Sequence, residues 1–216
     1  MSHDMRTPLN GIIGLLEIDK KHEEDITFLK RNREKANIAA NHLLSLINDV
    51  LDMSKIEEGE LVLSHEPFNV IEQGQEIMTI IGMQAQEQGL TTVMEVEPEV
   101  YENPYIYGSP LHLIRAMMNI YSNCIKYNKE NGEIRTHVRL LHSDEKILTY
   151  QWTISDTGIG ISEDYLNRIF EPFTQEGTDA RSVYQGTGLG MSIAKALFEQ
   201  MGGCLLYTSP SPRDTR

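Results

Sequence analysis

Residues 108–132 read "GSPLHLIRAMMNIYSNCIKYNKENG", and this stretch predicts one long helix. Ser109 is a favoured N-cap residue, and Pro110 suits the first helical position. Asn128 and Gly132 are expected to end the helix. The apolar residues between these limits recur at helical spacing, so the helix is expected to bury one side in a folded domain.

The other side of this predicted helix is polar. Its members are spaced three or four residues apart, which places them on nearly one face: Asn119, Asn123, Lys126 and Tyr127. An amide oxygen can complete the octahedral shell of a Mg2+ already held by phosphates and water, and a lysine can meet phosphate charge. The pattern therefore suits a magnesium triphosphate with Asn123 as metal ligand, while a solvent-exposed helix face explains it about equally well.

Short alternating elements surround this helix and indicate a mixed α/β domain. Their patterns have the lengths and turn signals of single strands and helices. We expect strands near 60–64, 91–97, 134–141 and 147–155, and helices near 70–88 and 189–201.

Two glycine-rich segments could bind a ligand. In "DTGIGI" (156–161), Asp156 can accept a hydrogen bond from an exocyclic amine, and Gly158 and Gly160 let the backbone approach a ligand. The second, "GTGLG", opens the last helix, where free amide N–H groups and the helix dipole favour phosphate; its residues are Gly186, Thr187, Gly188, Leu189 and Gly190. Each signal alone is weak, because glycine turns after strands are common and the second segment lacks P-loop spacing.

The segment between the two glycine-rich stretches contains "RIFEPF" (168–173) and then a polar loop. Phe170 and Phe173 are most simply interpreted as core residues. Arg181 is the single cation of the loop from about 174 to 187, and such a loop could close over a nucleotide.

The first 57 residues predict a helical hairpin. Apolar residues recur at helical spacing over 9–18 and 26–56, Asp25 is a suitable N-cap, and Gly59 lies just beyond the second helix. One hairpin cannot bury so wide an apolar stripe, so a second copy completing a four-helix bundle is the simplest solution. Packing against the chain's own second domain is the alternative.

Taken together, "SHDMRTPLN", "NIYSNCIKY", "DTGIGI", "FEPF" and "GTGLG" occur in an order that closely resembles the sensor histidine kinase family over residues 2–203. The resemblance implies an α+β fold: a dimerisation and phosphoacceptor hairpin, then an ATP-binding α/β sandwich of the kind found in Hsp90, MutL and gyrase B. Ser109 stands where relatives usually carry Asp, and Cys124 replaces a usual Ala.

The same resemblance assigns roles to the motif residues. His3 would be phosphorylated, and the remaining residues would form the nucleotide site as N-box (Asn119, Asn123), G1 box (Asp156, Gly158, Gly160), F-box (Phe170, Phe173) and G2 box (Gly186, Gly188, Gly190).

The phosphoacceptor motif itself has a chemical interpretation. A neutral imidazole is a good nucleophile towards the γ-phosphate if one ring nitrogen keeps its proton, and Asp4 could fix that tautomer. Thr7, four residues after His3, shares its face and could orient water for dephosphorylation. Pro8 removes one helical N–H donor close to this chemistry. Without the other motifs, His3 would be interpreted as a plain surface histidine.

Composition limits the partners. Lys plus Arg total 19 against 32 Asp plus Glu, and the net charge of −13 disfavours nucleic acid and anionic membrane as partners. Two cysteines without metal-ligand spacing fit a reducing, cytoplasmic compartment. No apolar run is long enough to span a bilayer, although a plasma-membrane anchor elsewhere in a full-length protein stays open.

We therefore expect three regions: a dimerisation and phosphoacceptor domain at 1–62, a catalytic ATP-binding domain at 63–203, and a foreign or disordered tail at 204–216 that would make the chain a C-terminally truncated fragment. The predicted function is ATP- and Mg2+-dependent autophosphorylation on His3 by a homodimer, followed by phosphotransfer to an aspartate of a response regulator. The alternatives are a GHKL-type ATPase and a catalytically silent dimeric nucleotide-binding scaffold.

Overall fold

The computed structural model of the chain describes residues 2–22, 24–176 and 187–208, with only the backbone described for 2–4. Contacts divide the chain into two compact units. The first comprises 1–61 with 185–189, and the second comprises 62–184 with 190–216. Each unit is described by itself below.

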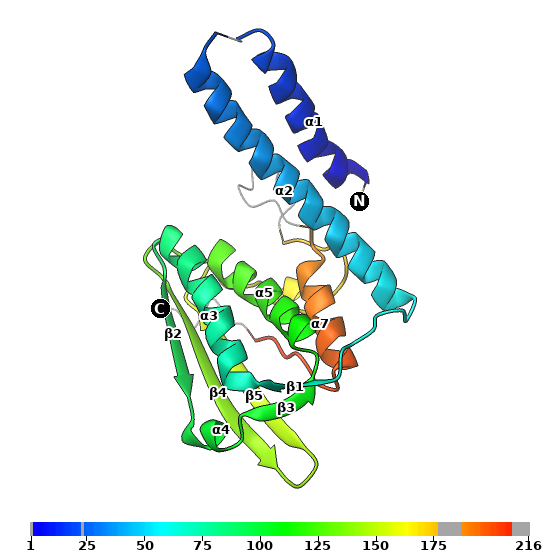
Figure 1. Cartoon of the computed structure of the whole chain (residues 1–216), viewed down its shortest axis with the longest axis vertical. Coiled ribbons are helices and arrows are strands. Elements are labelled where there is room, and N and C mark those ends of the chain that lie inside the picture. Colours follow the sequence, from blue (N-terminus) through cyan, green and yellow to red (C-terminus); the bar gives the residue numbers. More distant parts are fainter. Residues whose placement is uncertain (1, 23, 177–186, 209–216) are drawn as a thin grey trace. The chain divides into compact units, whose positions relative to one another are not determined.

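The first unit is the predicted helical hairpin, drawn in blue to cyan in Figure 1. Helix α1 (Ser2–Asp19) keeps Pro8 inside it, and α2 (Ile26–Glu57) follows a short turn. Asp25 caps α2 as predicted, because its carboxylate accepts a hydrogen bond from the amide of Phe28 at 2.9 Å. The hairpin is thus built from two strong local signals, helical periodicity and an N-cap.

A partly buried polar pair joins the two helices. The amide of Asn32 donates to the carboxylate of Asp19 at 2.8 Å, and Asn32 is only 4% exposed. Such a bond fixes the register of one helix against the other, because a slip would leave a buried amide unpaired.

The hairpin leaves large apolar side chains exposed on both helices. They share the helical spacing of the predicted stripe and include Leu9, Ile13, Leu16, Leu44, Ile47 and Leu51. Two helices alone therefore do not bury the stripe.

The second unit contains two sheets. In the smaller, β1 (Glu66–Asn69) pairs antiparallel with β3 (Tyr105–Gly108). In the larger, β4 (Glu133–Ser143) lies between β2 (Thr91–Val96), to which it is parallel, and β5 (Leu148–Asp156), to which it is antiparallel. The helices of this unit are α3 (Val70–Glu87), α4 (Pro98–Glu102), α5 (Pro110–Lys126), α6 (Glu163–Leu166) and α7 (Gly190–Gln200).

The core lies between the larger sheet and helices α3 and α5 (Figure 1). Alternate residues of β4 point inward, and Ile134, Thr136 and Val138 are almost fully buried. The hydroxyl groups of Thr136 and Tyr121 lie 2.6 Å apart, so the one polar side chain in this row bonds to α5. Helix α5 is therefore held to the central strand by apolar packing and by a buried hydrogen bond.

One local prediction is wrong. Residues 60–65 form no strand, because the amide of Ser64 donates to the hydroxyl of Ser109 at 3.2 Å instead of to a strand partner. Ser109 does occupy the N-cap position of α5, but it makes no capping hydrogen bond. Its hydroxyl lies 2.6 Å from the ring of His112 and 2.8 Å from the hydroxyl of Ser64.

We predict that Tyr121→Phe and Thr136→Val each destabilise the protein by about 1–3 kcal/mol, because each leaves one buried hydroxyl unpaired. The double variant should lose less than the sum of the two losses, since it removes both hydroxyls. Urea unfolding of the four proteins measures this coupling. Burial also raises the pKa of Tyr121 to about 12, although the bond to Thr136 lowers it.

The raised pKa has its own consequence. In the unfolded chain the Tyr121 phenol has its ordinary pKa of 10.0. The contribution of the neutral, buried phenol to folding stability is therefore complete below pH 10.0 and is lost as the pH rises towards 12. Tyr121→Phe should lack this component of alkaline destabilisation. If the double variant lost as much stability as the two single variants together, the bond between Tyr121 and Thr136 would be contradicted.

Candidate functional site

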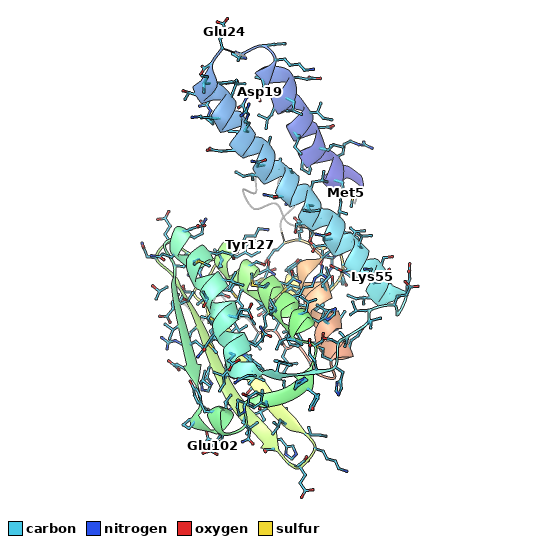
Figure 2. All side chains as sticks on the ribbon, viewed as in Figure 1. Met5, Asp19, Glu24, Lys55, Glu102 and Tyr127 are labelled. Carbon is cyan, nitrogen blue, oxygen red and sulfur yellow. The ribbon has the colours of Figure 1, made fainter. Side chains whose placement is uncertain are left out.

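Helix α5 has two different faces. The face turned to the core holds six buried residues, Leu113, Ala116, Met117, Ile120, Tyr121 and Cys124. The predicted polar residues lie on the other side: Asn119, Asn123 and Lys126 are half-buried, and Tyr127 is exposed at the C-cap, where Figure 2 labels it. The ammonium of Lys126 lies 4.7 Å from the centre of the Tyr127 ring. The sequence therefore placed Asn119, Asn123 and Lys126 correctly on α5, with Tyr127 just beyond its last residue.

The N-terminus of α7 meets this polar face. A Cβ at Gly190, the first residue of α7, would lie 3.3 Å from the amide oxygen of Asn119. The amide group of Asn119 thus touches the first turn of α7, where N–H groups lack helical partners and carry the positive end of the helix dipole. Amide groups, a cation and a helix N-terminus together favour an anion such as a phosphate group.

The residues just before α7 have a local structure of their own. The hydroxyl of Thr187 accepts from the amide of Leu189 at 3.0 Å, and Gly188 has a φ of +67°, which favours glycine. Residues 185–189 group with the first unit, so these three are described by their own bonds alone. Gly186 and Arg181, both predicted to contact the nucleotide, lie outside the described residues.

The segment 156–160 is held against the end of α5. Asp156 ends β5, and its carboxylate accepts a hydrogen bond from the amide of Gly158 at 2.8 Å. The amide of Ile159 donates to the carbonyl of Tyr127 at 3.1 Å. A Cβ at Gly158 would come within 2.6 Å of that carbonyl oxygen and of the Asp156 carboxylate, so only glycine fits here. The segment with Asp156, Gly158 and Gly160 is therefore attached to the C-terminal end of α5, the helix that carries Asn123.

A second attachment between this segment and the end of α5 was not predicted from the sequence. The hydroxyl of Thr157 donates to the amide oxygen of Asn128 at 2.9 Å and accepts from the amide of Glu133 at 2.9 Å. Thr157 lies inside the quoted "DTGIGI" and Asn128 directly follows Tyr127. Their pairing has no local signal, because the two residues are 29 positions apart.

Two further groups lie close to Asp156. Burial raises the pKa of the Cys124 thiol, and the negative charge of Asp156 and a hydrogen bond to it raise it further. Burial likewise raises the pKa of Tyr207, and electrostatic interactions with Asp156, Cys124 and Glu176 raise it further. Both groups are therefore neutral at neutral pH.

The two predicted phenylalanines differ. Phe170 is half-buried with the ammonium of Lys195 5.1 Å from its ring centre. Phe173 is 48% exposed and has a φ of +64°, a strained value for a bulky residue. The interpretation of Phe173 as a core residue is therefore wrong.

The predicted phosphoacceptor residues lie on α1. His3 and Asp4 belong to its first turn, but their side chains are outside the described ones, and Thr7 is exposed. Their assigned roles stay predictions.

The described part of the chain contains no group of three or more His, Cys, Asp or Glu residues that could hold a metal ion. Among the described helices, none is both long and apolar enough to cross a membrane.

Two family models match the chain. Residues 108–216 match the histidine kinase-, DNA gyrase B- and HSP90-like ATPases, and residues 1–59 match the His Kinase A phospho-acceptor domain. The first match begins at residue 108 and includes α5 and α7, and the second includes His3.

Named proteins of similar sequence and structure are histidine kinases. "Signal transduction histidine-protein kinase BarA" of Escherichia coli strain K12 is 36% identical over 216 residues, or 99% of this chain and 23% of that protein. Full-length ShkA in complex with AMPPNP has a TM-score of 0.65 at 27% identity, covering 93% of this chain and 40% of that one. Histidine kinase ThkA in complex with response regulator TrrA has a TM-score of 0.67 at 22% identity, covering 94% and 53%, respectively. The chain thus spans about a quarter of the length of the curated relative.

We predict that Asn123→Ala lowers the affinity for Mg-ATP at least about tenfold, because it removes the oxygen that would complete the metal shell. The free energy of unfolding should change by no more than about 0.5 kcal/mol, since the side chain is not part of the core. Binding can be followed with a fluorescent ATP analogue, and unfolding with Trp152, the chain's single tryptophan. Asn41→Ala, an exposed amide on α2, is the control. Unchanged affinity in Asn123→Ala would remove this residue from the site.

Proposed function

Since the chain belongs to the histidine kinase-, DNA gyrase B- and HSP90-like ATPase family and carries both domains of a sensor histidine kinase core, we propose that it phosphorylates its own His3 with ATP. The phosphoryl group then passes to an aspartate of a response regulator. One observation carries the proposal: the polar face of α5 meets the N-terminus of α7 in a chain whose first helix holds the candidate phosphoacceptor. We assign phosphotransfer to residues 1–62 and ATP binding to 63–203.

In this proposal the residues around α5 hold the nucleotide. Asp156 accepts a hydrogen bond from the exocyclic amine of adenine, Lys126 meets phosphate charge, and the first turn of α7 offers backbone N–H groups. Asn123, with Asn119 beside it, would hold Mg2+ through an amide oxygen, and the ion would supply positive charge to the phosphate oxygens. These groups fit an anion in a chain of net charge −13, because the positive potential is built locally.

The remaining proposed contacts come from the two segments that precede α7. Phe170 and Phe173 border the nucleotide, and Arg181 and Gly186, which lie outside the described residues, contact it. Thr187, Gly188 and Leu189 lead into α7, and glycine at 188 and 190 allows the backbone to approach phosphate.

The chemistry takes place at the His3 imidazole. A neutral ring nitrogen attacks the γ-phosphorus, a nitrogen–phosphorus bond forms, and the bond to the β–γ bridging oxygen breaks, so ADP leaves with that electron pair. Asp4 accepts a hydrogen bond from the other ring nitrogen and stabilises the positive charge that develops. In the transfer step an aspartate oxygen of the regulator attacks the same phosphorus, and the imidazole leaves.

The partners follow from the hairpin. ThkA has been solved with a response regulator, which supports a receiver domain as acceptor. The exposed apolar side chains of α1 and α2 support a homodimer, because a second hairpin would cover them. We place the reaction in the cytoplasm, since it consumes ATP and both cysteines are free thiols.

We predict that γ-labelled ATP gives the full chain an acid-labile, base-stable label that is lost in His3→Gln. A phosphoramidate on histidine hydrolyses in acid and survives base, unlike a phosphoester. His42→Gln, a histidine on α2, is the control and should label like the wild type. ATP hydrolysis without label would favour a plain ATPase, and ATP binding without either would favour a silent scaffold.

We predict that Thr7→Ala impairs dephosphorylation of the regulator more than autophosphorylation, because the hydroxyl orients water and the imidazole does not need it. Asp4→Ala should do the reverse, since it removes the group that orients the imidazole. The two rates can be measured separately with a phosphorylated regulator and with labelled ATP. Equal losses of both activities in both variants would show that the two residues only support the helix.

A further inference from the structure

The turn formed by residues 171–174 places a phenylalanine where turns favour glycine. The amide of Thr174 donates to the carbonyl of Glu171 at 3.4 Å, which closes a four-residue turn with Pro172 at its second position. Phe173, the third residue, has a φ of +64°. Glycine adopts this conformation without strain, whereas a bulky residue does not. A bulky side chain held in such a conformation points to a role other than folding.

The ring of Phe173 is not what anchors this segment to the core. Ile169, four residues earlier, is 6% exposed and belongs to the buried core, whereas Phe173 is 48% exposed. Half of the ring surface therefore stays available to a ligand.

Two neighbouring side chains hold the strained turn in place. The hydroxyl of Thr174 lies 2.9 Å from the carbonyl of Arg168 and 2.7 Å from the carbonyl of Glu171. The phenol of Tyr165 donates to the carbonyl of Thr174 at 2.9 Å. The residue that directly follows Phe173 is thus tied through both its side chain and its backbone. These bonds oppose relaxation of the strained φ, because the chain cannot turn at Phe173 without breaking them.

The same segment is attached to two parts of the proposed nucleotide site. The carboxylate of Glu176 accepts from the amide of Ser162 at 3.0 Å, and Ser162 directly follows the glycine-rich segment 156–161. The ammonium of Lys195, on α7, lies 5.1 Å from the centre of the Phe170 ring. The strained turn is therefore carried by a segment that contacts both α7 and the residue next to 156–161.

We propose that Thr174 and Tyr165 are positioning residues for nucleotide binding: their bonds keep Phe173 in its strained conformation, so that its ring projects from the turn and contacts the bound nucleotide. The inference rests on the proposed nucleotide site. In this arrangement Thr174 and Tyr165 act on the nucleotide only through the ring of Phe173. Glycine at position 173 would favour folding, and phenylalanine favours binding.

The first experiment separates stability from binding at position 173. Phe173→Gly should melt at the wild-type temperature or above it, because glycine relieves the strain. Its affinity for Mg-ATP, measured by titration calorimetry on the full chain, should fall at least about fivefold because the ring is lost. Thr153→Val, at an exposed threonine of β5, is the control and should bind like the wild type. A clearly lower melting temperature, or an unchanged affinity, in Phe173→Gly would overturn the inference.

The second experiment tests the two positioning residues. Thr174→Val removes the hydroxyl at nearly constant volume and should weaken Mg-ATP binding about three- to fivefold, whereas Thr174→Ser should bind within about twofold of the wild type. Tyr165→Phe should weaken binding about two- to threefold. In a Phe173→Gly background neither Thr174→Val nor Tyr165→Phe should lower the affinity further, since the ring through which they act is gone.

Two results would overturn the positioning role: Thr174→Ser that binds as weakly as Thr174→Val, and a further loss of affinity in the Phe173→Gly background. If Thr174→Val does not fold, Tyr165→Phe with and without Phe173→Gly makes the same comparison. A wild-type chain that does not bind Mg-ATP would overturn the proposed function as well. Wild-type binding that none of these variants changes would overturn this inference alone.

Discussion

One face of helix α5 packs against the core, and the other carries the amide side chains of Asn119 and Asn123. Tyr121 on the inner face reaches the hydroxyl of Thr136 on the central strand, so the helix cannot rotate without breaking a buried hydrogen bond. Its last turn is fixed again by the bond from the Ile159 amide to the Tyr127 carbonyl. The positions of Asn119, Asn123 and Asp156 all depend on these two attachments.

An acidic chain can bind a polyanion only where backbone and side chains create a local positive potential. The net charge is −13, yet the site combines Lys126 with the N-terminal turn of α7. Backbone N–H groups carry no net charge and add nothing to long-range repulsion or attraction, so they favour phosphate at short range. The contact between Gly190 and Asn119 is what brings this dipole to the polar face of α5.

In the hairpin, a polar bond fixes how the two helices align, while large apolar side chains stay exposed. The partly buried bond between Asn32 and Asp19 fixes the register of its two helices. The apolar side chains that remain exposed on α1 and α2 are costly for an isolated hairpin in water, because each keeps apolar surface hydrated. A partner surface removes this cost, which is why the same residues support a homodimer.

Short-range signals in the sequence were enough for most of the helices and strands. Helical periodicity placed α1, α2, α3, α5 and α7, alternation placed β4 and β5, and Asp25 marked the start of α2. The spacing of Asn119, Asn123, Lys126 and Tyr127 likewise placed them on α5, because a helix converts a spacing of three or four residues into one face.

Contacts between distant residues were decided by the tertiary structure alone. The strand expected at 60–64 is absent because Ser64 bonds to Ser109, 45 residues away, and the short elements α4, β3 and α6 had no periodic pattern long enough to detect. The bond between Thr157 and Asn128 joins two residues 29 positions apart, so it depends on how the chain folds back on itself. Periodicity and capping act within a few residues, so the sequence determined the elements and their faces, whereas packing decided which faces meet.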